Sequence, residues 1–178
     1  VYGRSNYYVL KMFSENRPDV NLHTDLKPAS PEPVFRTNGF IGLGTNNTEA
    51  QFKDLKVIVN GEEIYTSEWS DFVDKWTIIR GDWKTEGNLL SQSQKGIDAL
   101  AILEDREFDD CTIELKAKKI SGTEGFRIVF GGTDPNNYFM ADIGSHTNES
   151  VIFREVNNEG SISLFDYRNT ASIKTDQW

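Results

Sequence analysis

The stretch from Cys111 to Gly144 decides the fold, and it reads CTIELKAKKI SGTEGFRIVF GGTDPNNYFM ADIG. Three runs of alternating apolar and polar residues are separated by two turn signals, which is the pattern of β-strands joined by tight turns. The turn signals are Ser121-Gly122 and Asp134-Pro135-Asn136-Asn137, because Gly and Asn tolerate positive φ and Pro fixes the first corner. We therefore predict an antiparallel meander of three strands with one apolar face and one polar outer face.

Alternation assigns each side chain of this meander to one of its two faces. The apolar face receives Cys111, Ile113, Leu115 and Ala117, then Phe126, Ile128 and Phe130, then Phe139, Ala141 and Ile143. The polar outer face receives Arg127, Tyr138, Met140 and Asp142 together with the charged residues of the first run.

Composition supports an all-β protein. The chain has 178 residues, a length typical of one domain, with 14 glycines and 12% aromatic residues spread over many short alternating runs. These features predict a two-sheet antiparallel sandwich. A formal net charge of -9 disfavours binding to nucleic acid or to an anionic membrane surface. The sequence contains no run of eighteen apolar residues, so it does not predict a membrane-spanning helix.

The remaining sequence divides into three parts. Residues 1–22 predict a helix, capped by Ser5 or Asn6 and stopped before Pro18, whose many apolar residues need a partner surface in an upstream domain. Residues 23–36 are a proline-rich linker, and residues 37–178 form the sandwich, which we expect to be truncated at its C-terminal end. Further strands are predicted over 39–44 and 50–59, with a polar loop at 45–48 between them and a bulge near Asp54. Asn60-Gly61 predicts a hairpin turn, with a return strand that starts at Ile64. The other predicted strands are 76–80, 83–85, 89–92, 99–103, 151–156, 161–167 and one from 171 onward.

Several motifs carry a family resemblance. The run YYVLKMFSENR at 7–17 resembles the last barrel helix of family 51 α-L-arabinofuranosidases. The runs GFIGLGT at 39–45, FKDLKV at 52–57, LKAKK at 115–119 and GTEGF at 122–126 resemble the laminin-G/concanavalin-A-like jelly roll attached to those enzymes. The resemblance implies an accessory module of a glycoside hydrolase that is extracellular or periplasmic and bacterial, although the residues alone leave a cytoplasmic location open.

Carbohydrate binding would require an exposed aromatic ring beside convergent polar side chains. Arg127, Tyr138 and Asp142 offer such groups at strand positions, and Glu124 and His146 offer them in adjoining turns. The alternative is that these are ordinary solvated positions with one structural ion pair, since alternation fixes the side of a residue but not its solvent access.

The tryptophans and acidic loops suggest a further contact and a metal site. Trp76 and Trp83 are predicted to pack in the core, whereas Trp69 lies in a polar turn and is the best candidate for an exposed ring. Asp71 and Asp74 could hold a structural calcium ion with backbone carbonyl groups, or they could simply be solvated. No other cofactor is expected.

We therefore expect a non-catalytic module that binds plant-type polysaccharide, such as arabinoxylan or arabinan, for an attached arabinofuranosidase domain. One alternative is a structural domain that packs on the catalytic barrel and has no ligand of its own. The other is a free-standing sandwich hydrolase, for which Glu114 and Asp142 are the first carboxylate pair to examine. Catalysis in this chain is disfavoured because no βαβ pattern holds carboxylates at a barrel mouth.

Overall fold

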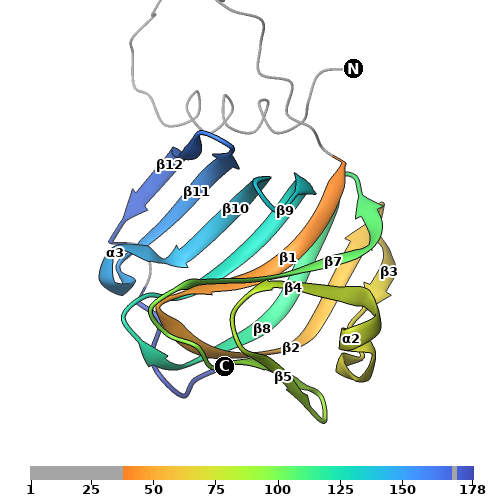
Figure 1. Ribbon diagram of the computed structural model, residues 1–178, viewed down its shortest axis with the longest axis horizontal. Coiled ribbons are helices and arrows are strands. Elements are labelled where there is room, and N and C mark those ends of the chain that lie inside the picture. The colour runs from red at the N-terminus through yellow and green to blue at the C-terminus, as the bar shows by residue number, and fades with distance from the viewer. Residues whose placement is uncertain (1–37, 170–171) are drawn as a thin grey trace, which may run out of the picture. The chain divides into compact units, whose positions relative to one another are not determined.

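A computed structural model describes residues 38–169 and 172–178, which form two antiparallel sheets (Figure 1). The prediction of an all-β sandwich is confirmed. The helix predicted over 1–22 and the linker over 23–36 lie outside the described residues.

The larger sheet, sheet A, contains seven strands in the order β12-β11-β10-β9-β1-β7-β4. Their bounds are β1 Gly39–Asn46, β4 Trp76–Arg80, β7 Asp98–Phe108, β9 Phe126–Asp134, β10 Asn137–Gly144, β11 Ser150–Asn157 and β12 Gly160–Arg168. The four strands β9 to β12 follow one another both in sequence and in space, because short turns join antiparallel neighbours.

The smaller sheet, sheet B, is organised around β2. Strands β3 and β6 pair with different parts of β2 along one edge, β5 pairs with β6, and β8 pairs with β2 along nearly its whole length. The bounds are β2 Thr48–Val59, β3 Glu62–Thr66, β5 Trp83–Glu86, β6 Leu89–Gln92 and β8 Cys111–Gly122. Three short helical turns complete the described part of the chain: η1 Trp69–Asp71, α2 Phe72–Lys75 and α3 Ser145–Asn148.

The predicted three-stranded meander is wrong at its first strand. β9 and β10 pair with each other in sheet A, but β8 pairs with β2 in sheet B. The chain therefore crosses between the sheets after Gly122 (φ 109°), and at Gly125 the backbone passes so close to the Ile143 carbonyl that a Cβ would lie 2.1 Å from it. Alternation gives the apolar side of a strand but not its pairing partner.

Of three other local predictions, one is confirmed, one is modified and one is wrong. The register of β2 against β8 shifts between Lys53 and Lys56, and Asp54 has φ 53°, as the predicted bulge requires. The predicted polar loop between the first two strands narrows to a turn at Asn47 (φ 43°). The predicted last strand is wrong within residues 172–178, where only Thr175 forms a β-bridge, to Lys119.

The main core lies between the two sheets. Ile41 and Leu43 of β1 pack in the same buried cluster as Phe52 and Val57 of β2. Trp76 and Trp83 join this cluster, as predicted.

The prediction of an exposed ring at Trp69 is wrong. Its side chain is 1% exposed, and its ring lies 5.8 Å from the ring of Trp76 and 6.3 Å from that of Phe72. The 3-10 turn of η1 directs this indole inward although its sequence neighbours are polar. A ring so deeply buried cannot stack on a sugar.

The outer face of sheet A, which points away from sheet B, is also apolar. It carries a second buried cluster of alternate residues, Phe40, Leu100, Ile102, Val129, Tyr138 and Met140. The predicted polar outer face is therefore wrong for this sheet, whereas Thr112, Glu114 and Lys116 of sheet B are exposed as expected. The lack of a side chain at Gly42 explains part of this burial, because it lets Ile102 of β7 and Val129 of β9 approach each other over β1. A Cβ at Gly42 would lie 3.1 Å from Ile102 and 3.4 Å from Val129.

Candidate functional site

An ionic cluster on the outer face of sheet A is the best candidate site. Arg127 of β9 lies directly opposite Asp142 of β10, and Arg154 lies two strands away from Arg127 on β11. The Arg127 Nη2 atom lies 3.4 Å from Asp142 Oδ2, and the Arg154 Nε atom lies 3.5 Å from the same oxygen. The structure thus brings together two of the predicted residues and adds a second arginine.

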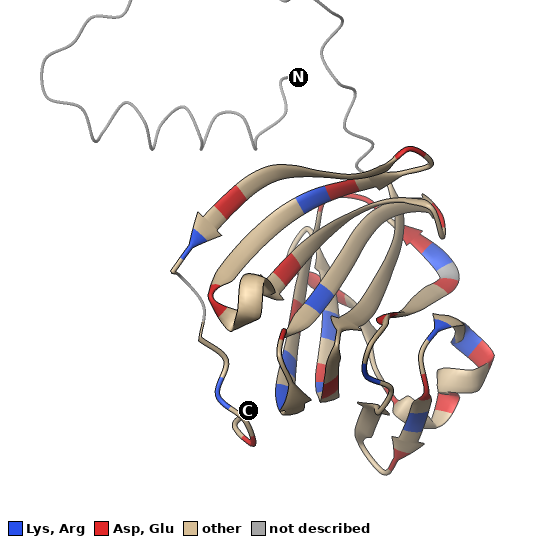
Figure 2. Ribbon diagram, turned by 60° about the vertical axis from the view of Figure 1, so that its left-hand side comes forward, with Lys and Arg blue, Asp and Glu red and all other residues tan. Residues whose placement is uncertain are grey.

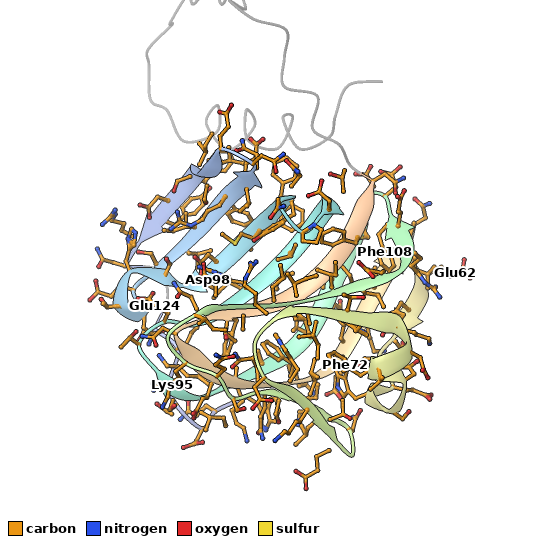
Figure 3. All side chains as sticks on the ribbon, in the orientation of Figure 1. Glu62, Phe72, Lys95, Asp98, Phe108 and Glu124 are labelled. Carbon is orange, nitrogen blue, oxygen red and sulfur yellow. The ribbon has the colours of Figure 1, made fainter. Side chains whose placement is uncertain are left out.

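The cluster is deeply set. The Asp142 side chain is 1% exposed, that of Arg127 11% and that of Arg154 19%. A buried carboxylate requires such partners, because an uncompensated charge in a low-dielectric environment is strongly unfavourable. At its outer edge the cluster reaches solvent through Asp98, which is labelled in Figure 3 and is 56% exposed. The Asp98 Oδ1 atom lies 2.9 Å from Arg127 Nη1.

The Arg127–Asp98 contact crosses β1 at a glycine. β9 and β7 lie on the two sides of β1, where Gly44 pairs with Arg127 on one side and with Leu100 on the other. A Cβ at Gly44 would lie 3.3 Å from the Arg127 Cβ and 2.6 Å from the Ala99 carbonyl oxygen. The absence of a side chain therefore leaves room for the guanidinium to reach across the strand.

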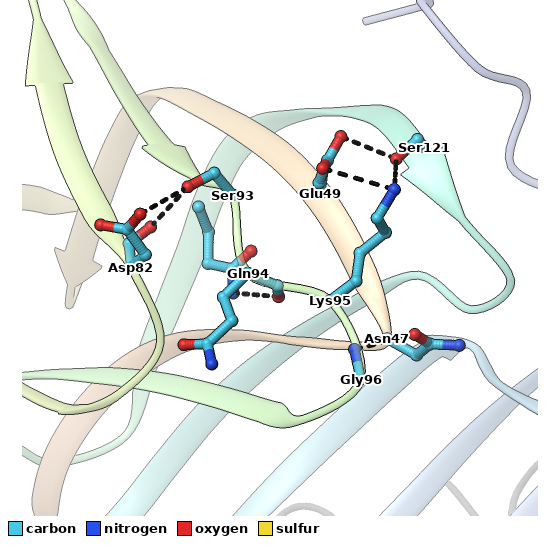
Figure 4. A network of polar contacts seen from close by, with 9 residues as sticks. Asn47, Glu49, Asp82, Ser93, Gln94, Lys95, Gly96 and Ser121 are labelled. Atoms are coloured by element: carbon cyan, nitrogen blue, oxygen red, sulfur yellow. Dashed lines mark hydrogen bonds and ion pairs between the residues drawn. The ribbon is translucent and has the colours of Figure 1, made fainter.

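A polar network fixes the loop that precedes Asp98 (Figure 4). The Asn47 side-chain oxygen accepts the Gly96 N–H at 2.9 Å, and the Asn47 N–H donates to the Ile97 carbonyl at 3.2 Å. Lys95 contacts both Ser121 and Glu49. The hydrogen bond from Ser121, followed by Lys95, lowers the pKa of the Glu49 carboxyl group. Asp98 is thus held at the start of β7 by contacts from β2 and β8.

Three polar atoms of the cluster have no hydrogen-bond partner. They are Asp142 Oδ1, Arg127 Nε and Arg154 Nε, and all three are buried. Buried polar atoms are nearly always hydrogen-bonded, so unpartnered ones mark places where a further group is expected. Arg154 Nε still lies 3.5 Å from Asp142 Oδ2, so Asp142 Oδ1 and Arg127 Nε are the two atoms of the cluster whose hydrogen-bonding capacity is left for water or a bound hydroxyl group.

Tyr138 lies on the same face but not in the ionic cluster. It is 8% exposed, it pairs with Val156, and Met140 separates it from Asp142 along β10. Four residues of strand place Tyr138 about 13 Å from Asp142. A ligand touching both residues would have to extend along the strand.

Glu124 contacts the turn after β10, which contains His146. Both carboxylate oxygens of Glu124 accept the Thr147 N–H, at 3.1 and 3.2 Å. His146, Thr147 and Asn148 all have positive φ (52°, 61° and 72°), an arrangement that costs about 1–3 kcal/mol per residue outside glycine. Glu124 stabilises this left-handed turn, and the His146 Nδ1 atom is buried without a partner.

The predicted calcium ligands, Asp71 and Asp74, lie in the two short helical turns η1 and α2. The Asp71 carboxylate forms an ion pair with Lys75, and Asp74 is exposed. Within residues 38–169 and 172–178, no group of three or more His, Cys, Asp or Glu residues is arranged to hold a metal ion. Calcium binding at Asp71 and Asp74 stays a prediction.

The predicted hydrolase pair is not brought together. Glu114 is exposed on the outer face of sheet B, whereas Asp142 lies on the outer face of sheet A, so the whole sandwich separates the two carboxylates. The sequence reasoning missed Arg154 and Asp98. The sequence did contain a signal for Arg154, because this charged residue follows Ile152 by two positions in the strand predicted over 151–156 and so shares a face with it.

The part of the chain that the structure describes contains no helix long and apolar enough to cross a membrane. Acidic and basic residues are mixed over the strands (Figure 2).

Comparison with known proteins gives one informative similarity. No protein-family model matches the chain, and no solved structure matches it. The chain is 27% identical over 177 residues to an extracellular exo-α-L-arabinofuranosidase of Streptomyces chartreusis, and the match covers 98% of this chain but 21% of that protein. The chain thus spans about a fifth of its relative, and the resemblance to arabinofuranosidases that the motifs predicted is confirmed.

Proposed function

We propose that this sandwich is a non-catalytic accessory module of an arabinofuranosidase-type glycoside hydrolase and that it binds arabinan or arabinoxylan on the outer face of sheet A. The similarity to part of an extracellular arabinofuranosidase supports the accessory role and an extracellular or periplasmic location. The upstream catalytic domain and a plant-type polysaccharide are the proposed partners.

The observation that carries the binding proposal is the set of unpartnered atoms around Asp142. Sugar hydroxyl groups both donate and accept hydrogen bonds. In this proposal the partly exposed side chains of Arg127 and Arg154 turn aside to admit the sugar, so that one hydroxyl group donates to Asp142 Oδ1 and a neighbouring oxygen accepts from Arg127 Nε. The apolar residues beside them, Val129 and Met140, suit the carbon face of a sugar ring.

Titration calorimetry with arabinan and arabinoxylan oligosaccharides tests this proposal. We expect saturable heat for the wild-type protein and at least tenfold weaker binding for Arg154→Met, because loss of a charge-assisted hydrogen bond is worth about 1.5–3 kcal/mol. Tyr138→Phe removes only a hydroxyl group and reports whether the ligand extends along β10. Val73→Ser, at a side chain 86% exposed on α2, is the matched control and should bind like the wild type.

Two outcomes would contradict the proposal. A folded protein that releases no heat with any of these glycans would refute carbohydrate binding at this face. If Arg154→Met binds these glycans with the same affinity as the wild type, the protein binds carbohydrate, but not at the proposed site on sheet A.

A structural role is the second candidate function. The six apolar residues buried on the outer face of sheet A are the specific observation in its favour, because a solvated sheet face is normally polar. In this role the domain would pack on the catalytic barrel without a ligand. Absence of glycan binding, together with a lower melting temperature of the catalytic domain when the sandwich is deleted from the full enzyme, would support it.

A further inference from the structure

Residues 172–176, which we name the strap, lie beside the end of β8 at the edge of sheet B. Thr175 forms a parallel bridge with Lys119 of β8, and the Asp176 N–H donates a hydrogen bond to the Lys119 carbonyl oxygen at 2.8 Å. Every residue of the strap except Ile173 is exposed. Such an exposed segment with exposed hydrogen bonds is typical of parts that open while the rest of a domain stays folded.

Asn148 of α3 clamps the backbone of the strap at Ile173. The Asn148 Nδ2 atom donates to the Ile173 carbonyl oxygen at 2.8 Å, and the Asn148 Oδ1 atom accepts the Ile173 N–H at 3.0 Å. The side-chain amide thus offers one donor and one acceptor, as the backbone of a neighbouring strand would. Two hydrogen bonds of the strap therefore depend on this single side chain.

The Ile173 side chain fills a notch between two glycines. A Cβ at Gly125 would lie 2.5 Å from the Ile173 Cδ1 atom, and a Cβ at Gly144 would lie 2.6 Å from it. Gly125 precedes Arg127 by two residues. Gly144 likewise follows Asp142 by two, so the strap packs against the end of β9 and β10 that carries the ionic cluster.

The clamping residue lies in a strained turn. Asn148 is the last of three successive residues with positive φ, a conformation that only glycine adopts at little cost. Glu124, labelled in Figure 3, holds this turn by accepting the Thr147 N–H with both carboxylate oxygens. Strained backbone of this kind is found at clamps and switch regions, and it persists only while the surrounding contacts hold it. The position of the Asn148 amide therefore depends on Glu124.

We propose that the strap opens and closes as one unit, that Asn148 is its latch, and that Glu124 sets the latch. In the closed state the Asn148 amide clamps Ile173, whose side chain fills the notch. In the open state these two hydrogen bonds and the one from Asp176 to Lys119 are lost together, and the notch is uncovered. The change is an order–disorder transition of a short segment, which is a common form of conformational switch.

Hydrogen–deuterium exchange of single backbone amides tests this proposal. The Asp176 amide is the reporter of opening, because its acceptor belongs to Lys119 and not to the latch. Asn148→Gly removes the clamp but suits the positive φ of this position, so it adds no backbone strain. We expect the Asp176 amide to exchange at least about tenfold faster in Asn148→Gly than in the wild type, because the strap loses two hydrogen bonds.

Variants of Glu124 test whether the strained turn sets the latch. Glu124→Ala should also speed the exchange of the Asp176 amide, whereas Glu124→Gln keeps an acceptor oxygen for the Thr147 N–H and should retain most of the protection. Asn158→Gly is the matched control, at an exposed asparagine in the turn between β11 and β12, and should leave this exchange unchanged. Circular dichroism melts show whether each variant is folded at the temperature of the exchange experiment.

Three results would overturn the proposal. A wild-type Asp176 amide that exchanges as slowly as the amides of β2 would show that the strap is a fixed part of the sandwich. Unchanged exchange in folded Asn148→Gly would show that the asparagine serves only the positive φ, and unchanged exchange in folded Glu124→Ala would show that the turn does not set the latch. Different rate changes for the Ile173 and Asp176 amides in Glu124→Ala would show that the strap does not open as one unit.

Discussion

Replacing Asp142 by asparagine should strongly destabilise the sandwich. The substitution keeps the shape of the side chain but removes a negative charge that lies 3.4 Å from one guanidinium atom and 3.5 Å from another. At an effective dielectric constant of about 20, each contact is worth about 5 kcal/mol before the cost of burial is subtracted. Burial offsets much of this gain in the wild-type protein. In the variant, however, the mostly buried Arg154 loses its carboxylate partner, and Arg127 keeps only the exposed Asp98.

The expected loss in the free energy of unfolding is about 3–5 kcal/mol, as for other buried ion pairs that lose one partner. In domains of this size, 1 kcal/mol changes the melting temperature by about 2–4 °C, so the Tm should fall by roughly 6–20 °C. Circular dichroism melts at constant pH and salt measure this change.

Asp98→Asn is the matched control, because Asp98 contacts the same arginine from an exposed position. Its carboxylate lies 2.9 Å from Arg127 Nη1 but is 56% exposed, so solvent screens the pair and its loss should cost at most about 1 kcal/mol. Equal losses for the two variants would refute the argument that burial sets the strength of this cluster. An unchanged Tm for Asp142→Asn would refute the cluster itself.

Two further predictions concern the core and the edge of sheet B. Trp69→Ala should lower the free energy of unfolding by about 3–5 kcal/mol, because a buried aromatic side chain is replaced by a cavity; a denaturant midpoint equal to that of the wild type would show that the ring is not in the core. Lys119 is 5% exposed, and burial lowers its pKa, with Glu124 acting in the opposite direction. Between this lowered pKa and the ordinary lysine value of about 10.4, the unfolded chain binds more protons than the folded one, so this lysine makes stability rise with pH. Lys119→Met should therefore raise the Tm at pH 7, and its advantage over the wild type should shrink towards pH 10; an advantage that stays constant with pH would contradict the burial of this ammonium group.

The candidate site was predicted in part. Arg127 and Asp142 were placed on one face by alternation, and the structure pairs them directly across β9 and β10. Arg154 and Asp98 come from strands that the sequence does not link to this pair. Cross-strand neighbours depend on the order of strands in a sheet, which no local pattern contains.

The sequence by itself determined the class of fold and most of the strands. Period-two alternation defined the inward side of β2, β8 and β9, and the signal at Asn60-Gly61 predicted the hairpin between β2 and β3, because these features depend on residues close together in the chain. Tertiary structure alone decided that β8 joins sheet B and that Trp69 turns inward. It also decided that the outer face of sheet A is buried, because a bare strand at Gly42 and Gly44 lets side chains from β7 and β9 close over β1. Burial is a property of neighbours brought together from distant parts of the chain, and only the folded arrangement supplies them.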